Sequence, residues 1–175
     1  MDALRLTLSL LLFLISTSTV ASTLEKYALV IGNSDYDIGA LNNPVNDATD
    51  IATRLKSLGF NVSHLLNANL REMDQAIRIF TKQLTGKNKV GLFYFAGHGI
   101  ELDGRNYLIP VNADIEIATD LKYSAVDAGR VLDGMEYAGN GLNMVILDAC
   151  RNNPFKRRFR SVTKGLAKME APKGS

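Results

Sequence analysis

The chain has 175 residues, of which 46% are hydrophobic and 22% are charged, a composition that fits one globular domain. A formal net charge of +2 is too small to indicate nucleic-acid binding, so we expect no nucleic-acid partner. The single cysteine excludes an internal disulfide bond.

Residues 1–21 have the layout of a secretory signal peptide. A short head contains Arg5, residues 6–15 form a leucine-rich apolar centre, and small residues lead to Ala21. The apolar centre is short for a membrane span, which favours a cleaved signal over an uncleaved one that would anchor the chain in a membrane. We therefore expect an exported mature chain, periplasmic or secreted, in which a lone thiol is either buried or used.

After this leader, predicted strands alternate with predicted helices. Apolar runs indicate strands, and apolar residues at helical spacing indicate helices. In chain order the pattern predicts a strand at 26–32, a helix at 46–58, a strand at 61–66, a helix at 69–84, a strand at 90–99, a hairpin turn at 101–106, a short strand at 107–110, a helix at 124–137 and a strand ending at Cys150. Such alternation predicts an α/β fold with a mainly parallel sheet and helices on both faces.

Local signals support several of these boundaries. Pro44 precedes the first helix and Gly59 is placed to end it. Asn69 and Glu72 have the spacing of a capping box at the start of the second helix. His64 alternates with apolar neighbours in its strand, which favours a structural or surface histidine over a catalytic one.

Two apolar strands end in residues that can do chemistry. The run 144–147 has no polar alternation, which predicts a strand covered on both faces that presents Asp148 and Cys150 at its carboxyl end. The run 90–99 presents His98 between two glycines, which we expect to leave the imidazole unscreened and open to a substrate backbone. If the two strands are parallel neighbours, His98 and Cys150 meet at one edge of the sheet.

A cysteine and a histidine at one edge suggest nucleophilic catalysis. The thiolate is the reactive form of cysteine, and an adjacent imidazole can accept the thiol proton and later protonate a leaving amine. The alternative is that Cys150 is a buried structural residue at the end of a core strand.

Other site types lack their motifs. The sequence has neither Gly-x-Gly-x-x-Gly nor a Gly-Lys-Ser/Thr phosphate loop, and it has no Gly-x-Ser-x-Gly elbow. Two histidines and one cysteine, without His-Glu-x-x-His, offer no recognisable metal ligand set. We therefore expect no cofactor and no metal.

Tyr-Phe-Ala-Gly-His-Gly at 94–99 and Leu-Asp-Ala-Cys-Arg-Asn-Asn at 147–153 resemble the motifs of caspase-like cysteine peptidases, with the histidine about 50 residues before the cysteine. The resemblance is closest to the paracaspase and bacterial caspase-like branch and runs from about residue 26 to about residue 172. It implies a caspase-like three-layer sandwich. It also implies that Cys150 is the nucleophile, that His98 is the acid and base, and that the N–H groups of Gly99 and Cys150 form the oxyanion hole.

The same resemblance implies the substrate preference. Asp148 stands where true caspases have Gln, and Asp47 matches a second acidic position of the primary pocket. Two carboxylates in one partly dry pocket favour an Arg or Lys side chain and reject an Asp substrate. The alternative is that Asp47 is an N-terminal helix charge and Asp148 a turn former.

The resemblance also divides the chain into a signal peptide at 1–21, a catalytic domain at 22–155 and a basic tail at 156–175 that starts the intersubunit region. Family members continue into two more strands that complete the substrate pocket, so we expect a fold truncated of its last strands. Either the sequence is a fragment, or a homo-oligomer or another chain completes the pocket, or the protein is not an efficient peptidase. In the tail, Lys156, Arg157, Arg158 and Arg160 are candidate self-cleavage sites; the alternative is a solvated basic run.

Two functions remain open from the sequence. The first is a cysteine endopeptidase that acts on a protein or peptide substrate. The second is a catalytically silent caspase-like module that binds a partner chain through the same cleft or through an open sheet edge.

Overall fold

A computed structural model describes residues 23–37, 39–150 and 166–169, and for Cys150 the backbone only. In these residues a six-stranded sheet has the order β2-β1-β3-β4-β5, and β6 pairs with β3. The strands are β1 (Glu25–Gly32), β2 (Asn61–Leu66), β3 (Lys89–Leu102), β4 (Arg105–Leu108), β5 (Val126–Asp127) and β6 (Leu142–Cys150). The helices are α1 (Pro44–Ser57), α2 (Leu70–Gln83), α3 (Leu121–Ser124) and α4 (Ala128–Tyr137), with a 3-10 turn η1 (Ala118–Asp120).

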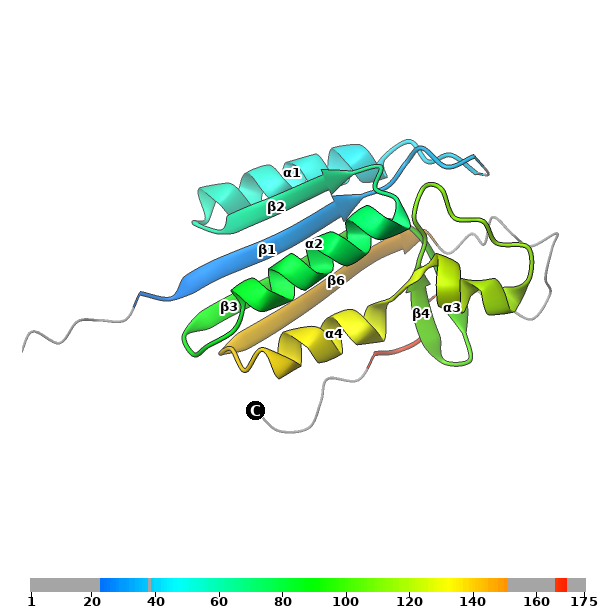
Figure 1. The fold of residues 1–175 in the computed structure, drawn as a ribbon. Coiled ribbons are helices and arrows are strands. Elements are labelled where there is room, and N and C mark those ends of the chain that lie inside the picture. The colour runs from blue at the N-terminus through cyan, green and yellow to red at the C-terminus, as the bar shows by residue number, and fades with distance from the viewer. Residues whose placement is uncertain (1–22, 38, 151–165, 170–175) are drawn as a thin grey trace, which may run out of the picture.

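Strand β3 organises the sheet. It pairs in parallel with β1 on one side and β6 on the other, and β1 pairs in parallel with β2. Beyond His98 it continues into an antiparallel hairpin with β4. The parallel strands therefore end at the same edge, close to the β4 hairpin and α3 (Figure 1).

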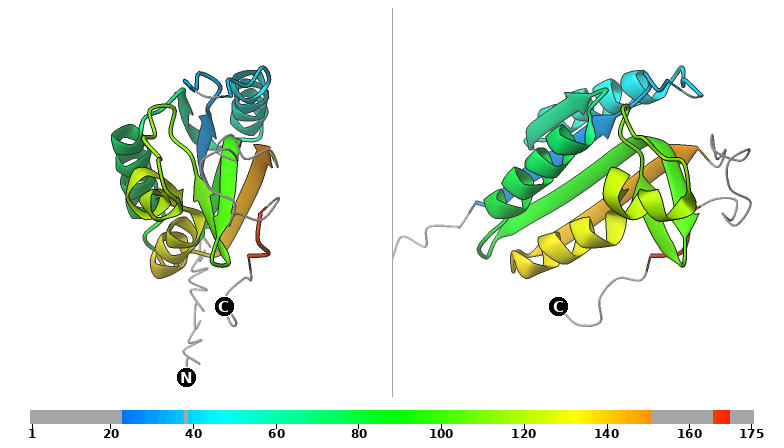
Figure 2. Two further views of the ribbon diagram at one scale, coloured as in Figure 1. Left: turned by 90° about the vertical axis from the view of Figure 1, so that its right-hand side faces the viewer. Right: turned by 45° about the vertical axis from the view of Figure 1, so that its right-hand side comes forward.

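Helices cover both faces of the sheet, which gives the predicted three layers (Figure 2). Side chains alternate between the faces, as the pleat requires. On one face, Val30, Leu92 and Tyr94 pack with Ala48 and other residues of α1. The opposite face packs against α2 and α4 in a larger cluster that includes Leu29, Ile31, Phe93, Phe95, Met73, Phe80, Leu84, Val131 and Met135.

Most of the local signals are confirmed. Asn69 caps α2 in a reciprocal capping box with Glu72. Gly59 follows α1 at φ +81°, a conformation that glycine adopts without steric cost. Pro44 lies inside the first turn of α1 instead of before it, where its missing N–H is not needed.

The predicted helix 124–137 starts too early. Most of it is α4, which begins at Ala128; Ser124 ends the separate helix α3, and Val126 and Asp127 form β5. Asp127 caps α4, since its side chain accepts a hydrogen bond from the N–H of Gly129 at 2.8 Å. Pairing with β4 holds this segment extended until the cap.

The prediction that the strand at 144–147 is covered on both faces is wrong. In the described part of the chain β6 pairs only with β3, and Ile146 is 45% exposed. Helix α4 covers the other face of β6, where Val145 and Leu147 contact the larger core cluster. The strand therefore lies at an edge of the described sheet and is half covered.

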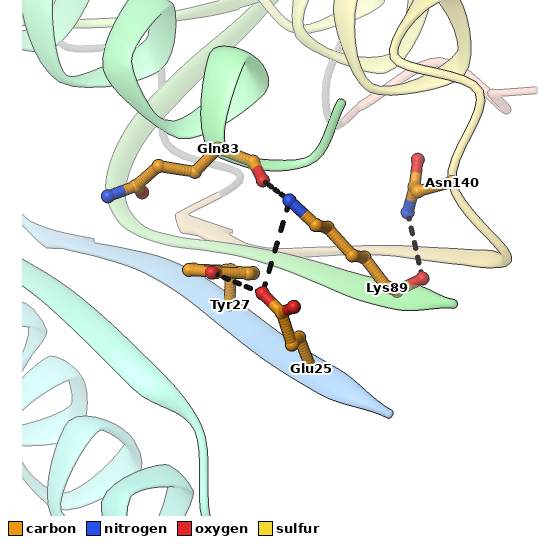
Figure 3. Close-up of polar contacts among 5 residues, drawn as sticks. All are labelled: Glu25, Tyr27, Gln83, Lys89 and Asn140. Carbon is orange, nitrogen blue, oxygen red and sulfur yellow. Dashed lines mark hydrogen bonds and ion pairs between the residues drawn. The ribbon is translucent and has the colours of Figure 1, made fainter. Parts of the chain in front are cut away.

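Polar contacts close the opposite, amino-terminal end of the sheet (Figure 3). Lys89 Nζ donates to the backbone carbonyl of Gln83 at 2.8 Å and lies 4.0 Å from the carboxylate of Glu25. Tyr27 Oη donates to the same carboxylate at 2.6 Å, and the amide of Asn140 donates to the carbonyl of Lys89 at 3.3 Å. These contacts join β1, β3, α2 and the loop before β6 far from the carboxyl edge.

Asn106 fixes residues 166–169 to the domain. Its side chain donates to the carbonyl of Ala167 at 2.9 Å and accepts from the N–H of Ala167 at 2.7 Å, as a neighbouring strand would. Residues 151–165, which hold the candidate self-cleavage sites, lie outside the described residues.

No helix in the described residues is both long and apolar enough to cross a bilayer. Residues 1–21 lie outside this part, so the signal peptide and the export stay predictions.

Candidate active site

The backbone places the histidine and the cysteine next to each other. His98 on β3 and Cys150 on β6 are register partners in a parallel pair, the last pair of that ladder. Both positions therefore lie at the carboxyl edge of neighbouring strands, where the sequence predicts that they meet. This edge is where open α/β sheets collect ligands and chemistry.

The imidazole of His98 is more enclosed than the flanking glycines suggest. Only 3% of the residue is exposed, so the expectation of an unscreened ring is wrong. The covering groups come from the loop that follows β1. The ring of Tyr36 lies 4.5 Å from the imidazole between centroids, and the carbonyl of Gly39 lies 2.6 Å from Nε2.

The contact with Gly39 assigns the tautomer. A carbonyl oxygen can only accept a hydrogen bond, so Nε2 carries the proton in the neutral ring and Nδ1 carries the lone pair. Nδ1 is buried and has no hydrogen-bond partner in the described residues. Burial lowers the pKa of His98, and the Gly39 hydrogen bond opposes that effect in part. The ring is thus held neutral with a basic nitrogen available.

The backbone N–H of Gly99 points toward the side of β3 on which β6 lies. The N–H of Ile109 donates to the carbonyl of His98 at 3.0 Å, which makes Gly99 and Leu108 a non-hydrogen-bonded pair of the β3–β4 hairpin. Asn33 N–H donates to the carbonyl of Ala96, so β4 and β1 lie on one side of β3, opposite β6. The amide of Gly99 therefore points toward position 150 of β6.

The two carboxylates predicted for a substrate pocket lie near the same tyrosine. Tyr94 Oη donates to Asp148 Oδ2 at 3.3 Å. The pKa of Tyr94 is raised to about 12, first by burial, then by the charge of Asp148 and its hydrogen bond, and last by the charge of Asp47. Asp47, in the first turn of α1, and Asp148, on β6, thus act on one hydroxyl.

The expected partial dryness of this acidic pair is wrong for the described residues, because Asp47 and Asp148 are both exposed. Their mutual repulsion is therefore moderated by water. His64, on β2, is half-buried and far along the sheet from β6, as expected for a histidine without a role at this edge. Among the described residues, no group of three or more His, Cys, Asp or Glu could hold a metal ion.

Sequence reasoning missed three groups at this edge. Tyr36 stands in a loop without a recognisable motif, and Gly39 contributes a backbone carbonyl that no side-chain pattern reveals. Tyr94 lies within an apolar run and resembles a core residue in the sequence. A tyrosine hydroxyl in a fully buried run needs a polar partner, and that requirement was the available signal.

Comparisons with known proteins show the family of the chain. The family model described as the caspase domain matches residues 25–173. The human mucosa-associated lymphoid tissue lymphoma translocation protein 1 and its mouse homologue are each 34% identical to this chain over 128 residues. The match covers 73% of this chain and 15% of each relative, so the chain spans a small part of their length.

A solved structure of a protein from Geobacter sulfurreducens has a similar fold, with a TM-score of 0.55 at 19% identity. The likeness covers 72% of this chain and 50% of the other. The two motifs that resemble paracaspases, the family match and the fold point the same way. The chain therefore belongs to the caspase-domain family of cysteine peptidases, close to its paracaspase members.

Proposed function

We propose that this chain is a cysteine endopeptidase that uses a Cys150–His98 dyad and cleaves peptide bonds after Arg or Lys. The observation that carries the proposal is the register pairing of positions 98 and 150, together with a buried imidazole whose Nδ1 has no partner in the described residues. A buried nitrogen without a hydrogen-bond partner is rare in folded proteins. It is explained if a reacting group supplies the missing hydrogen bond during catalysis.

The chemistry follows from the tautomer. Nδ1 of His98 accepts the proton of the Cys150 thiol, and the thiolate attacks the scissile carbonyl carbon. The N–H groups of Gly99 and Cys150 donate to the oxyanion that forms. The imidazolium then protonates the leaving amine, and a water molecule hydrolyses the thioester while His98 again accepts and returns a proton.

The carbonyl of Gly39 orients the base throughout this cycle. Its hydrogen bond to Nε2–H keeps the lone pair on Nδ1, and it also stabilises the imidazolium, in which both nitrogens are donors. A backbone carbonyl here does the work of the carboxylate in a Ser-His-Asp triad.

The preference for Arg or Lys rests on Asp47 and Asp148. Both carboxylates act on the hydroxyl of Tyr94, so a cation placed near Tyr94 has two negative partners. Among the described residues, the hydrogen bond from Tyr94 uses Oδ2 of Asp148, and the other oxygen can accept from a guanidinium or ammonium group. An Asp side chain in the same place meets repulsion from both acids.

An active-site thiol probe tests the dyad. We expect the wild-type chain to react with an iodoacetamide probe much faster than a free thiol does, and we expect Cys150→Ala to abolish labelling. His98→Ala should reduce turnover by about 10²- to 10⁴-fold, as the loss of a general base does. His64→Ala is the matched control because it removes the other histidine. Labelling at the rate of a free thiol would instead support a silent binding module.

A panel of peptides that differ only at the residue before the scissile bond tests the specificity. Cleavage after Arg and Lys, and none after Asp, is expected. Asp148→Asn should lower kcat/KM for the Arg peptide by about 3- to 30-fold, because one exposed charge pair is lost. Asp50→Asn, which changes an exposed acid elsewhere on α1, serves as the control. Preferential cleavage after Asp would refute the assignment of the pocket.

A further inference from the structure

Tyr36 is a buried tyrosine in the loop between β1 and α1, and only 7% of it is exposed. It belongs to a second core cluster beneath the β4 hairpin, together with Ile100, Tyr107 and Ile109. Buried tyrosines usually direct the hydroxyl to a specific partner. The hydroxyl of Tyr36 has two such partners at the carboxyl edge of β3.

The hydroxyl of Tyr36 links the backbones of His98 and Ile109. It accepts a hydrogen bond from the N–H of His98 at 3.0 Å and donates to the carbonyl of Ile109 at 3.1 Å. These directions are fixed, because an N–H can only donate and a carbonyl can only accept. The N–H of Ile109 in turn donates to the carbonyl of His98 at 3.0 Å. Three residues thus form a closed ring of hydrogen bonds around the backbone that carries the imidazole.

The ring of Tyr36 also contacts the imidazole itself. The two ring centroids are 4.5 Å apart, and the planes are tilted by 50°. Gly97 makes room for this approach, since a Cβ at that position would lie 2.5 Å from the Tyr36 hydroxyl oxygen. The first glycine of the Gly-His-Gly motif therefore leaves room for the Tyr36 hydroxyl and for the ring of Phe95.

The same loop holds the imidazole at a second point through the carbonyl of Gly39, which contacts Nε2. The backbone of His98, the face of its ring and one ring nitrogen are thereby fixed, and Nδ1 is left without a partner in the described residues.

We propose that Tyr36 is a positioning residue for His98: its hydroxyl and ring hold the imidazole in the orientation that keeps Nδ1 available as the base. This inference rests on the proposed Cys–His chemistry for its functional meaning, but the orientation of the ring can be measured without it. The proposed role is exerted through His98, whose backbone and ring Tyr36 contacts.

The kinetic test compares two tyrosines of one cluster. Tyr36→Phe keeps the aromatic ring and removes both hydroxyl hydrogen bonds. Tyr107→Phe is the same substitution in a tyrosine of the same cluster that is 4% exposed and makes neither a hydrogen bond nor a ring contact with His98 among the described residues. With an Arg peptide we expect Tyr36→Phe to lower kcat by about 10- to 100-fold, the cost of a small misplacement, with KM within about twofold of wild type. We expect Tyr107→Phe to leave both constants unchanged.

A spectroscopic test does not depend on turnover. The chain has two histidines, so a His64→Gln background leaves the ring of His98 as the only imidazole. Ring ¹⁵N shifts should report the Nε2–H tautomer in this background and in Tyr107→Phe. In Tyr36→Phe they should move toward a tautomer mixture.

The outcomes are distinguishable. If Tyr36→Phe leaves the ring ¹⁵N shifts unchanged, or if Tyr107→Phe changes them equally, Tyr36 is not a positioning residue. If the wild-type chain shows the Nε2–H tautomer and the Tyr36 effect but no Cys150-dependent turnover, the proposed peptidase function fails and the positioning role stands. Loss of kcat together with an equal rise in KM would point to general damage and would also refute the inference.

Discussion

His98 is a buried titratable group, and burial determines how it responds to pH. Its pKa in the folded chain is lowered, chiefly by desolvation, whereas an unfolded chain protonates histidine near pH 6.5. Below about pH 6.5 the unfolded chain therefore binds more protons than the folded chain. The stability that the buried neutral ring contributes is therefore fully present above about pH 6.5. It is lost as the pH falls from there through the pKa of His98 in the folded chain.

We expect the melting temperature of the wild-type chain to fall between pH 7.5 and pH 5, and His98→Gln to show a smaller fall. His64 also has a lowered pKa, through burial and the charge of Lys56, so His64→Gln is the parallel variant that measures the other contribution. Thermal melts over this pH range should separate the contributions of His98 and His64 to the fall in melting temperature. An identical pH slope in wild type and His98→Gln would contradict the burial of the neutral ring.

The sequence predicts that His98 and Cys150 lie together, but it does not predict what surrounds His98. His98 and Cys150 could be placed together because both follow apolar runs, and parallel strands end at one edge. The enclosure of His98 could not be predicted, since it depends on Tyr36 and on a carbonyl of Gly39 that reach it from a distant loop. Sequence spacing contains no information about such approaches.

At the scale of an element, the capping box should control the stability of α2. Asn69 Oδ1 accepts from the N–H of Glu72 at 3.0 Å, and Glu72 Oε2 accepts from the N–H of Asn69 at 2.9 Å. Asn69→Ala should lower the free energy of unfolding by about 1 kcal/mol, as loss of a helix cap does. Urea denaturation measures this change, and Gln75→Ala, at an exposed position inside α2, should change it by less than about 0.5 kcal/mol.

Because α2 packs on the face of the sheet opposite α1 and Asp47, Asn69→Ala should leave the Arg/Lys preference of any peptidase activity intact. A change in the preferred residue would mean that the cap affects the site and would contradict the separation of α2 from Asp47 and Asp148.

Elements differ in how well their sequences define them. The capping box and Gly59 act locally, and both were predicted. The helix assigned to 124–137 was too long because both Ser124 and Asp127 can cap a helix, and only the pairing of β5 with β4 selects Asp127. The run 144–147 is uniformly apolar, yet its exposure depends on which elements lie beside β6, and this is a property of the assembled sheet.

At the scale of the whole molecule, the basic run after Cys150 is a candidate substrate of the same chain. Four basic residues follow the proposed nucleophile within ten positions: Lys156, Arg157, Arg158 and Arg160. Asn106 fixes the chain again at Ala167. If the pocket prefers Arg or Lys, purified protein should be trimmed at these residues over time.

Intact-mass analysis of purified protein checks this expectation, and the Cys150→Ala variant prepared in parallel identifies cleavage by contaminating proteases. Fragments that end at 156–160 in wild type and are absent from Cys150→Ala are the expected result. Trimming that is equal in both samples would show that another protease is responsible.

The position of β3 determines which strands of the sheet open first. From Val90 to Ala96 this strand has neighbours on both sides, β1 and β6, while β2 lies outermost. Amide protons on such an inner strand exchange with solvent only when the whole domain opens, whereas outer strands fray at lower energy. Fluctuations that release β2 should therefore leave the backbone of the imidazole undisturbed, whereas release of β6, which also lies at an edge of the described sheet, separates positions 98 and 150.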